Sequence, residues 1–342
     1  MANEDLIKRA AAVVPSDRQL KWQEMEFYAF AHFGINTFSG KNGHEWGVGS
    51  EDPKLFNPTD FDADQWVAAI KSAGMTGLLL TAKHHDGFCL WPTETTEYCV
   101  RNSPYRAGHG DVVREVSDSC KKYGLKFGIY LSLWDRNCPL YGTPEYNDFY
   151  VRQLTELLTG YGEIFCIWLD GACGAKMDGK EPYPYDFDRI YKTVRELQPD
   201  AVISNCGPDI RWVGNESGRA RKSEWNVVPA FSCETQNIAS HSQQTDAQDM
   251  KQQASDSHLE DLGSRAFLAN YDSFMWYPAE VDVSIRPGWF YHKKESRRVR
   301  SLENLLRIYY GSVGGNSLLL LNVPPDTEGL LHEMDVRRLK EL

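Results

Sequence analysis

The chain has 342 residues, of which 42% are hydrophobic and 25% are charged, a composition typical of a globular protein. Its length fits either two average domains or one barrel of alternating strands and helices. No apolar run approaches the ~20 residues that span a bilayer, so no membrane association is expected. The formal net charge of −11 would repel a phosphate backbone, so nucleic acid is not an expected partner.

The cysteines and the start of the chain bear on the cellular compartment. Eight cysteines are spread singly along the sequence without a C-x-x-C pair, which favours reduced thiols. The first residues are polar and lack the apolar segment of a signal peptide. As it stands the sequence predicts a cytoplasmic location, or a periplasmic or secreted one if a leader was removed. It gives no indication of the oligomeric state.

Short apolar runs, taken in chain order, predict the strands. They are bounded by Gly, Pro, Asn or Asp and are apolar on both faces, as expected for strands of a parallel sheet that is covered on both sides. These runs are residues 27–38, 77–84, 125–133, 164–172, 201–206 and 317–323.

Helix-like segments lie between these runs. Residues 62–74, 111–124 and 187–200 each have an acidic residue at or near the start and Gly or Pro near the end. Their apolar residues recur at intervals of three and four, which indicates one buried face. The Lys- and Arg-rich stretch 292–300 is expected to be the exposed face of a late helix.

Alternation of strand and helix from end to end predicts parallel strands joined by helical crossovers. Two further strands are expected around residues 223–228 and 267–276, and the polar stretch 233–258 is expected to be a long loop. The count then reaches roughly eight, which predicts a single α/β domain over residues 1–342 with a TIM-like (β/α)8 barrel. A doubly wound open sheet is the alternative, weakened because no G-x-G-x-x-G follows the first strand.

Polar and aromatic residues follow the predicted strands, and a barrel places its chemistry at the carboxyl ends of strands. Taken alone, a histidine there is usually a hydrogen-bonded structural residue, and an Asp before Gly is usually a turn former. Together, hydrogen-bonding groups and flat tryptophan faces on one rim suit a sugar. The residues concerned are His32, Glu45, Trp46, His84, His85, Trp134, Asp170, Arg211 and Glu216.

A metal ion is the competing use of the adjacent His84 and His85. Neighbouring residues on a strand point to opposite faces, so both could bind one ion only after the strand has ended. No H-E-x-x-H or H-x-H motif stands beside them. Neither a metal nor a cofactor is therefore expected.

Retaining glycoside hydrolysis needs two carboxylates about 5 to 5.5 Å apart, one as nucleophile and one as acid and then base. Asp170 suits the nucleophile, because a buried strand would fix its backbone and Gly171 would leave room for a sugar. The second carboxylate could be Glu216, Glu224 or Glu234, and the spacing does not choose among them.

Several motifs resemble the catalytic domain of the retaining α-L-fucosidases, glycoside hydrolase family 29. The resemblance runs from about Val14 to Pro325, and several stretches are most similar to the subgroup that prefers α-1,3/1,4-linked fucose on Lewis-type glycans. The motifs are FAHFGINTF, HEWG, TAKHHDGFCLW, GIYLSLWD, IWLDGA, IRWVGNESG and WYPAEVDVSIRPGWFY.

The resemblance implies an enzyme that releases fucose from a fucosylated oligosaccharide or glycoconjugate. Asp170 in WLDG would be the nucleophile and Glu216 in GNESG the acid/base. The residues that would bind fucose are His32, Glu45, Trp46, His84 and His85, with Trp134 and Arg211 as further members and Arg286 and Trp289 closing the pocket.

The sequence differs from the family in one feature, and two other functions remain possible. Family members usually carry a C-terminal β-sandwich, whereas this chain ends in a helix-like segment, residues 331–342. A barrel without an evident sandwich is expected, either because the protein is a minimal form or because the chain is truncated before that domain. A fucose-binding relative without activity would keep the histidines and tryptophans. A metal-dependent barrel hydrolase is the other alternative.

Overall fold

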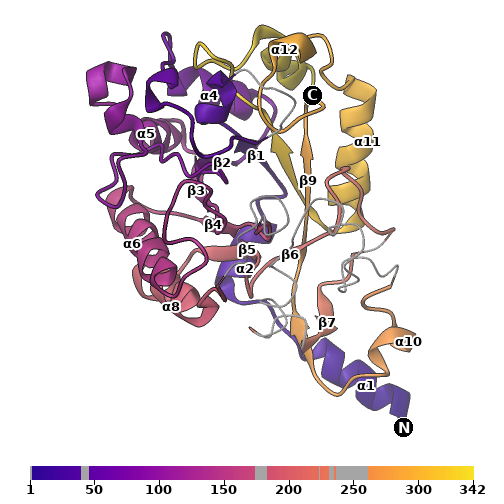
Figure 1. The fold of residues 1–342 in the computed structure, drawn as a ribbon. Coiled ribbons are helices and arrows are strands. Elements are labelled where there is room, and N and C mark those ends of the chain that lie inside the picture. Colours follow the sequence, from indigo (N-terminus) through magenta and orange to yellow (C-terminus); the bar gives the residue numbers. More distant parts are fainter. Residues whose placement is uncertain (1, 40–45, 174–182, 223, 231–234, 236–260) are drawn as a thin grey trace.

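The computed structural model describes residues 2–39, 46–173, 183–222, 224–230, 235 and 261–342. Eight strands form one sheet in the order β5-β4-β3-β2-β1-β10-β9-β6, and each neighbouring pair is parallel (Figure 1). The bounds are β1 Phe27–Ala31, β2 Gly77–Lys83, β3 Lys126–Leu131, β4 Cys166–Leu169, β5 Val202–Asn205, β6 Arg211–Trp212, β9 Ala279–Ser284 and β10 Leu318–Asn322.

The two edge strands of this sheet, β5 and β6, approach each other and nearly close it into a barrel. An isolated parallel bridge between Ser204 and Ile210 joins the edges. The chain passes from β5 to β6 through residues 206–210, without the helical crossover that usually joins parallel strands. The predicted TIM-like barrel is thus confirmed, with one irregular unit.

The two strands predicted around residues 223–228 and 267–276 do form, but not in the barrel. They are β7 (Val227–Pro229) and β8 (Phe274–Trp276), which pair antiparallel in a separate two-stranded sheet. The barrel places expected for them are taken by β6 and β9. Both were hard to recognise, because β6 is very short and β9 carries carboxylates on the face that points into the barrel.

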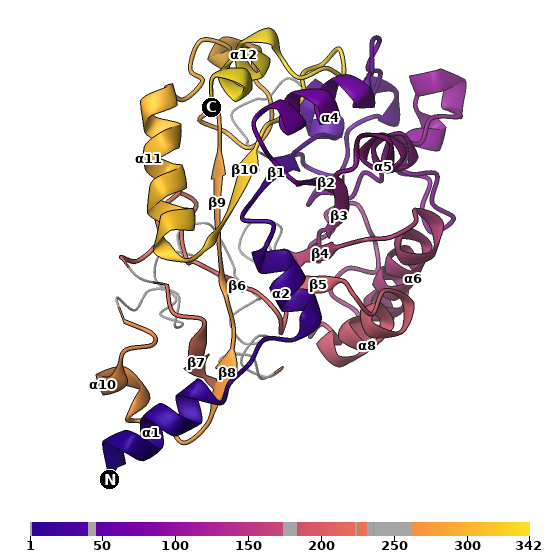
Figure 2. The same ribbon diagram turned by 180° about the vertical axis from the view of Figure 1, so that it is seen from behind.

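Helices cover the outside of the barrel, with α4, α5, α6 and α8 along one side and α11 along the other (Figures 1 and 2). The α-helices formed by the described residues are α1 Ala2–Ala11, α2 Asp17–Gln23, α3 Ile35–Phe38, α4 Ala63–Ser72, α5 Val112–Tyr123, α6 Glu145–Gly160, α8 Phe187–Leu197, α10 Arg265–Leu268, α11 Leu302–Ser312 and α12 Glu333–Glu341. Short 3-10 helices are η1 Pro53–Leu55, η2 Val100–Asn102, η3 Tyr105–Gly108, η7 Lys293–Glu295 and η8 Val313–Gly315.

Two of the three predicted acidic helix starts, Asp62 and Asp111, are confirmed, whereas the third helix is capped by Asp186, one residue before the predicted segment 187–200. All three carboxylates accept a hydrogen bond from the backbone N–H three residues further on. Such caps satisfy donors that the first helical turn leaves unpaired. None of the described helices is long and apolar enough to cross a bilayer.

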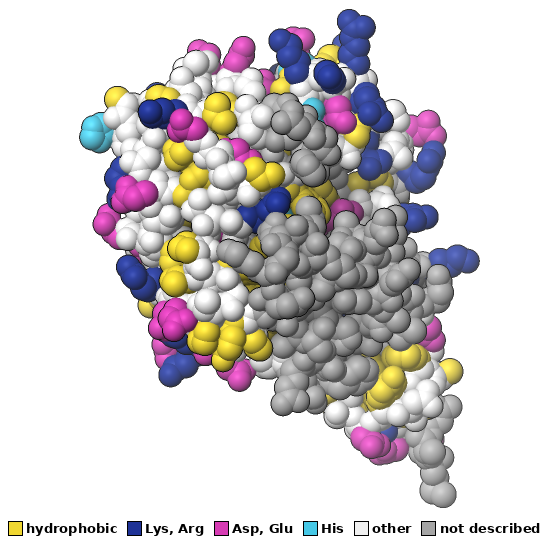
Figure 3. Space-filling view, viewed as in Figure 1, with side chains coloured by type: hydrophobic (Ala, Val, Ile, Leu, Met, Phe, Trp, Pro, Cys, Tyr) yellow, Lys and Arg dark blue, Asp and Glu magenta, His cyan; other side chains and the backbone are white. Residues whose placement is uncertain are grey.

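The prediction of a helix over residues 292–300 is wrong. Only the 3-10 turn Lys293–Glu295 forms there, and α11 begins later, at Leu302, after the N-cap Ser301. The segment has no apolar stripe to pack against the sheet, which explains the absence of a longer helix. Lys and Arg side chains gather beside α11 and α12 on the face shown in Figure 3.

Side chains alternate between the inside and the outside of the barrel along each strand. In β1, Phe27 and Ala29 pack outward against the helices, whereas Tyr28 and Phe30 point into the barrel. Trp22 of α2 joins the interior cluster and donates a hydrogen bond from Nε1 to the hydroxyl of Tyr28 at 3.3 Å. Side chains therefore fill the barrel interior, which is a packed core and not a channel, and this core lies directly beneath the carboxyl ends of the strands.

Candidate active site

Four of the predicted site residues lie at the same end of the barrel. His32 follows β1, His84 and His85 follow β2, and Asp170 follows β4. Because all these strands are parallel, their carboxyl ends meet at the same rim. Residues far apart in the sequence thereby become neighbours.

Asp170 is held by two hydrogen bonds and lies near a histidine. The hydroxyl of Tyr130 donates to Oδ2 at 3.0 Å, and the backbone N–H of Ala172 donates to Oδ1 at 2.8 Å. Nε2 of His85 lies 4.0 Å from Oδ2. Burial, followed by the negative charge of Asp170, raises the pKa of Tyr130, so this phenol stays a donor. The Asp170 side chain keeps 22% of its surface exposed, so a ligand can reach a carboxylate of fixed orientation.

His32 is oriented by Asn322 at the end of β10. The amide nitrogen of Asn322 donates to Oγ of Ser284 and to the carbonyl of Trp289. Its Oδ1 therefore accepts, both from the backbone N–H of His32 and from Nδ1–H at 2.9 Å. In a neutral ring this leaves Nε2 of His32 as a hydrogen-bond acceptor.

His85 is oriented in the same manner by Ser132. The serine hydroxyl donates to the carbonyl of Trp134 at 2.7 Å, so its oxygen accepts from Nδ1–H of His85, also at 2.7 Å. Nε2 of the neutral ring is then an acceptor on the side of Asp170. The indoles of Trp46 and Trp134 flank this imidazole, with ring centroids 5.4 and 4.8 Å away.

His84 lies among the other rings and is neutral. Its imidazole stacks on Tyr130 with centroids 5.4 Å apart, and it contacts the rings of His32 and Phe290. Burial, and then the charges that His85 and His32 would carry, lower the pKa of His84 well below its usual 6.5. Its buried Nδ1 makes no hydrogen bond within the described part of the chain.

Glu216 is the exposed carboxylate of the rim. It follows β6 in a turn fixed by the side chain of Asn215, whose Oδ1 accepts from the backbone N–H of Ser217 at 3.1 Å. Nε1 of Trp289 donates to Oε2 of Glu216 at 3.2 Å, and the indole ring lies 5.0 Å from that of His32. Trp289 thus connects Glu216 to the histidines.

The side chain of Asp282, in β9, lies close enough to both Asp170 and Glu216 to be affected by their charges. It is buried, and Nε1 of Trp212 donates to its Oδ1 at 2.8 Å. The pKa of Asp282 is raised well above 3.8 by burial, then by the negative charge of Glu216, and further by that of Asp170. Two carboxylates on one rim, with hydrogen-bonding imidazoles and indoles beside them, are the components of glycoside hydrolysis.

Comparison with known proteins agrees with this geometry. Residues 50–342 match the family model described as Alpha-L-fucosidase. The chain belongs to the alpha-L-fucosidase family. "Alpha-L-fucosidase 1" of Arabidopsis thaliana is 46% identical over 330 residues, covering 96% of this chain and 59% of the relative.

Solved alpha-L-fucosidase family structures match as well. The crystal structure of a Bacteroides ovatus protein assigned to the alpha-L-fucosidases has a TM-score of 0.89 and 52% identity, covering 100% of this chain and 57% of that one. A fucosidase of Ruminococcus gnavus, in complex with fucose, has a TM-score of 0.78 and 34% identity, covering 96% and 66%. The chain thus spans less than two thirds of the Arabidopsis thaliana and Bacteroides ovatus relatives.

Arg211 and Glu224, unlike the other predicted site residues that the structure describes, form a buried ion pair with each other. Nη2 of Arg211 donates to Oε2 of Glu224 at 2.8 Å, and its Nε donates to the carbonyl of Tyr277. Glu224 is fully buried and also pairs with Arg221. Its pKa is lowered by both arginines against the opposing effect of burial. A carboxylate held this way cannot exchange protons with a ligand, so Glu224 does not fit the acid/base. A role of Arg211 in substrate binding stays a prediction.

Arg286 is likewise engaged within the fold. Its Nε donates to Oδ2 of Asp335 at 2.8 Å, and its guanidinium lies over the ring of Tyr291 at 4.8 Å. Both partners of the ion pair are fully buried, and the pair attaches α12 to the segment that follows β9. Among the described residues no contact links Arg286 to the predicted pocket, and its role in closing that pocket stays a prediction. Glu45 and Glu234, and most of the predicted loop 233–258, lie outside the described residues.

Four residues of the site were not found from the sequence: Tyr130, Ser132, Phe290 and Asn322. Each lies within an apolar or aromatic run, where a structural role is the usual one. The only available signal was position, since Asn322 ends a strand of leucines and Ser132 follows β3 directly.

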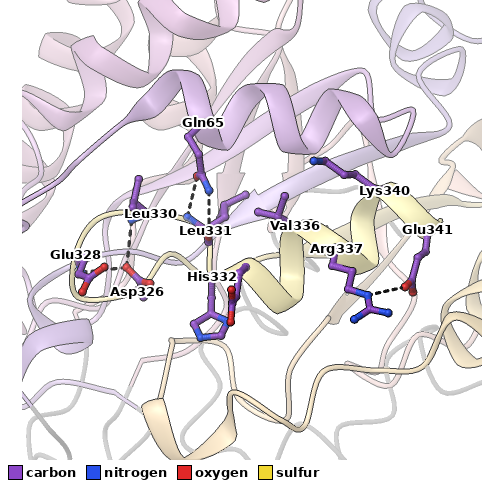
Figure 4. Close-up of a pocket in the computed structure, with 11 residues that line it drawn as sticks. Gln65, Asp326, Glu328, Leu330, Leu331, His332, Val336, Arg337, Lys340 and Glu341 are labelled. Carbon is purple, nitrogen blue, oxygen red and sulfur yellow. Dashed lines mark hydrogen bonds and ion pairs between the residues drawn. The ribbon is translucent and has the colours of Figure 1, made fainter.

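Two other features stand apart from this rim. Within the described ranges, no group of three or more His, Cys, Asp or Glu side chains is arranged to hold a metal ion. A pocket of about 790 Å³ lies beside α12, where Gln65 bonds both backbone groups of Leu331 (Figure 4). None of its lining residues belongs to the predicted site.

Proposed function

We propose that this chain is a retaining α-L-fucosidase with Asp170 as nucleophile and Glu216 as acid/base. The observation that carries the proposal is the setting of Asp170, a partly exposed carboxylate fixed by Tyr130 and Ala172 beside His85. Membership of the alpha-L-fucosidase family supports it. The Ruminococcus gnavus relative, whose crystal structure contains fucose, supports fucose as the sugar.

The reaction has two steps. An oxygen of Asp170 attacks the anomeric carbon while the bond to the leaving oxygen breaks, and Glu216 gives its proton to that oxygen. Glu216, now ionised, takes a proton from water, which attacks the same carbon and releases Asp170 as a carboxylate. Two inversions leave fucose in its original configuration.

The histidines and tryptophans would position the sugar. In neutral rings, Nε2 of His32 and Nε2 of His85 would be the acceptors, because Asn322 and Ser132 accept from the other ring nitrogens. Acceptors of fixed direction suit sugar hydroxyls, which can donate to them. The partly buried indole of Trp46 would offer flat apolar surface to the C–H side of a pyranose, and the buried indole of Trp134 packs against it from within.

We further propose that the preferred substrates are α-1,3/1,4-fucosylated oligosaccharides of the Lewis type. The support is the similarity of several motifs, among them IRWVGNESG and WYPAEVDVSIRPGWFY, to the subgroup with that preference.

Proton NMR of the reaction tests both proposals. The chain is mixed with an activated aryl α-L-fucoside and, separately, with a Lewis-type trisaccharide, and the first anomer of fucose is recorded before mutarotation. Release of α-fucose from both supports the whole proposal, and release from the aryl fucoside alone rejects the linkage preference. First appearance of β-fucose would exclude Asp170 as a nucleophile, and binding without release from either substrate would favour an inactive fucose-binding protein.

A further inference from the structure

Three side chains of β9 point into the barrel in succession, each held differently. Glu280, the deepest, accepts from Nε1 of Trp168 at 2.6 Å, and from Oγ of Ser204 and the hydroxyl of Tyr28. Ser284, at the strand end, bonds to Asn322. Asp282 lies between them and accepts from Trp212. Of the three, Asp282 is the one on which both rim carboxylates act.

Trp212 belongs to the strand that leads to Glu216. β6 pairs with β9 so that Trp212 stands opposite Glu280, and the backbone N–H of Val213 donates to the carbonyl of Glu280 at 2.9 Å. The bond from the indole of Trp212 to Asp282 adds a side-chain attachment at the end of this short pairing. Between Trp212 and the turn of Asn215 only two residues intervene. The position of Asp282 thus fixes where the Glu216 turn starts.

The neighbouring carboxyl groups also affect whether Asp282 carries a proton. Its surroundings contain three other carboxyls, namely Asp170, Glu216 and the buried Glu280. A carboxylate added among them in a buried site would be strongly disfavoured. Burial, then the charge of Glu216 and further that of Asp170, raise the pKa of Asp282 well above its usual range, which favours the neutral form of this acid. A neutral acid can anchor the indole N–H through one oxygen without adding a negative charge beneath the sugar.

We propose that Asp282 is a positioning residue for the acid/base carboxyl, acting through Trp212 to hold the turn that carries Glu216. The inference rests on the proposed function, because it assigns Glu216 the proton transfer. It differs from a structural role in one measurable respect. Misplacing Glu216 should slow reactions in proportion to how much the leaving oxygen needs a proton.

The experiment compares two substrates across variants of this chain. An aryl α-L-fucoside with an acidic nitrophenol needs little protonation on departure, whereas an α-L-fucosyl disaccharide needs much. We expect Asp282→Ala to reduce kcat/KM for the disaccharide about tenfold to a hundredfold, which is part of the roughly hundredfold to ten-thousandfold effect of general acid catalysis, and to reduce it much less for the aryl fucoside. Asp282→Asn keeps an oxygen acceptor for Trp212 and should recover most of the loss.

Two further variants keep the result interpretable. Trp212→Phe removes the donor instead of the acceptor and should repeat the substrate dependence, so it replaces Asp282→Ala if that variant does not fold. Glu280→Gln alters a buried carboxyl on the same face of the same strand and should leave the ratio of the two activities unchanged. Equal losses on both substrates, or none, in folded Asp282→Ala or Trp212→Phe would overturn the inference. A wild-type chain inactive on both substrates would instead reject the proposed function.

Discussion

The hydroxyl of Tyr130 donates a hydrogen bond to Oδ2 of Asp170 across two neighbouring strands of the barrel, at 3.0 Å. β3 and β4 pair in a register that places Tyr130 opposite Trp168, two residues before Asp170. The inward face of one strand thereby orients the carboxylate at the end of the next. This contact is the most direct link between the packed interior and the proposed chemistry.

Tyr130→Phe should therefore slow the reaction. A hydrogen bond to a charged group contributes about 1.5 to 3 kcal/mol, which corresponds to roughly a tenfold to hundredfold loss of kcat. Steady-state kinetics on an aryl fucoside measure it. Tyr150→Phe is the matched control, because that buried hydroxyl bonds only the carbonyl of Leu131 among the contacts described and lies away from Asp170. Unchanged kcat in Tyr130→Phe would contradict the assigned role.

Asp170→Asn should be nearly inactive while still binding fucose. The amide has the size of the carboxylate but is a poor nucleophile, and the imidazoles and indoles of the pocket remain. Calorimetric titration with fucose and a turnover assay on the same preparation separate binding from chemistry. The exposed Asp200→Asn serves as a control for the substitution itself. Full turnover in Asp170→Asn would refute the nucleophile assignment.

Glu216 and Glu224 can be distinguished by chemical rescue. Glu216→Ala should be slow, and azide should restore turnover of an activated aryl fucoside, forming fucosyl azide with the configuration of the substrate, because the small anion replaces the water that Glu216 would activate. Glu224→Gln should instead lower the melting temperature, because it leaves Arg211 without its buried partner. Azide rescue of Glu224→Gln, but not of Glu216→Ala, would reverse the assignment.

Asp86, next to the paired histidines, should make stability depend on pH. Burial raises its pKa to about 7 from 3.8, with the charges of Glu51 and Asp135 adding to the rise and the hydrogen bond from Phe88 opposing it. The folded chain then binds a proton that the unfolded chain releases, so stability falls as pH rises from about 3.8 to about 7.

Asp86→Asn should remove the contribution of Asp86 to the decrease of the free energy of unfolding with pH. For one proton this contribution is up to about 1.4 kcal/mol per pH unit. Urea unfolding at pH 5, 6, 7 and 8 measures the difference between variant and wild type, with Asp200→Asn as the control. Parallel curves for wild type and Asp86→Asn would show that Asp86 is ionised in the folded chain.

Several features of the protein followed from the sequence alone. Apolar runs with Gly, Pro or Asn at their ends fixed most of the barrel strands, because a strand covered on both faces needs an almost uninterrupted apolar segment. The acidic caps Asp62 and Asp111 marked the helix starts, because capping is a local interaction. The motif TAKHHDGFCLW indicated the family, which the comparisons confirm.

Tertiary structure decided the rest. The sequence did not reveal β6 and β9 as barrel strands. β6 is only two residues long and is held mainly by its pairing with β9, and β9 carries the charged residues Glu280 and Asp282 on its inward face. The sequence and the family resemblance grouped Arg211 and Arg286 with the sugar-binding residues, whereas in the fold the buried carboxylates of Glu224 and Asp335 hold the two guanidiniums. Local sequence determines which segments form strands and helices, whereas long-range pairing determines which polar side chain meets a partner and which remains available to a substrate.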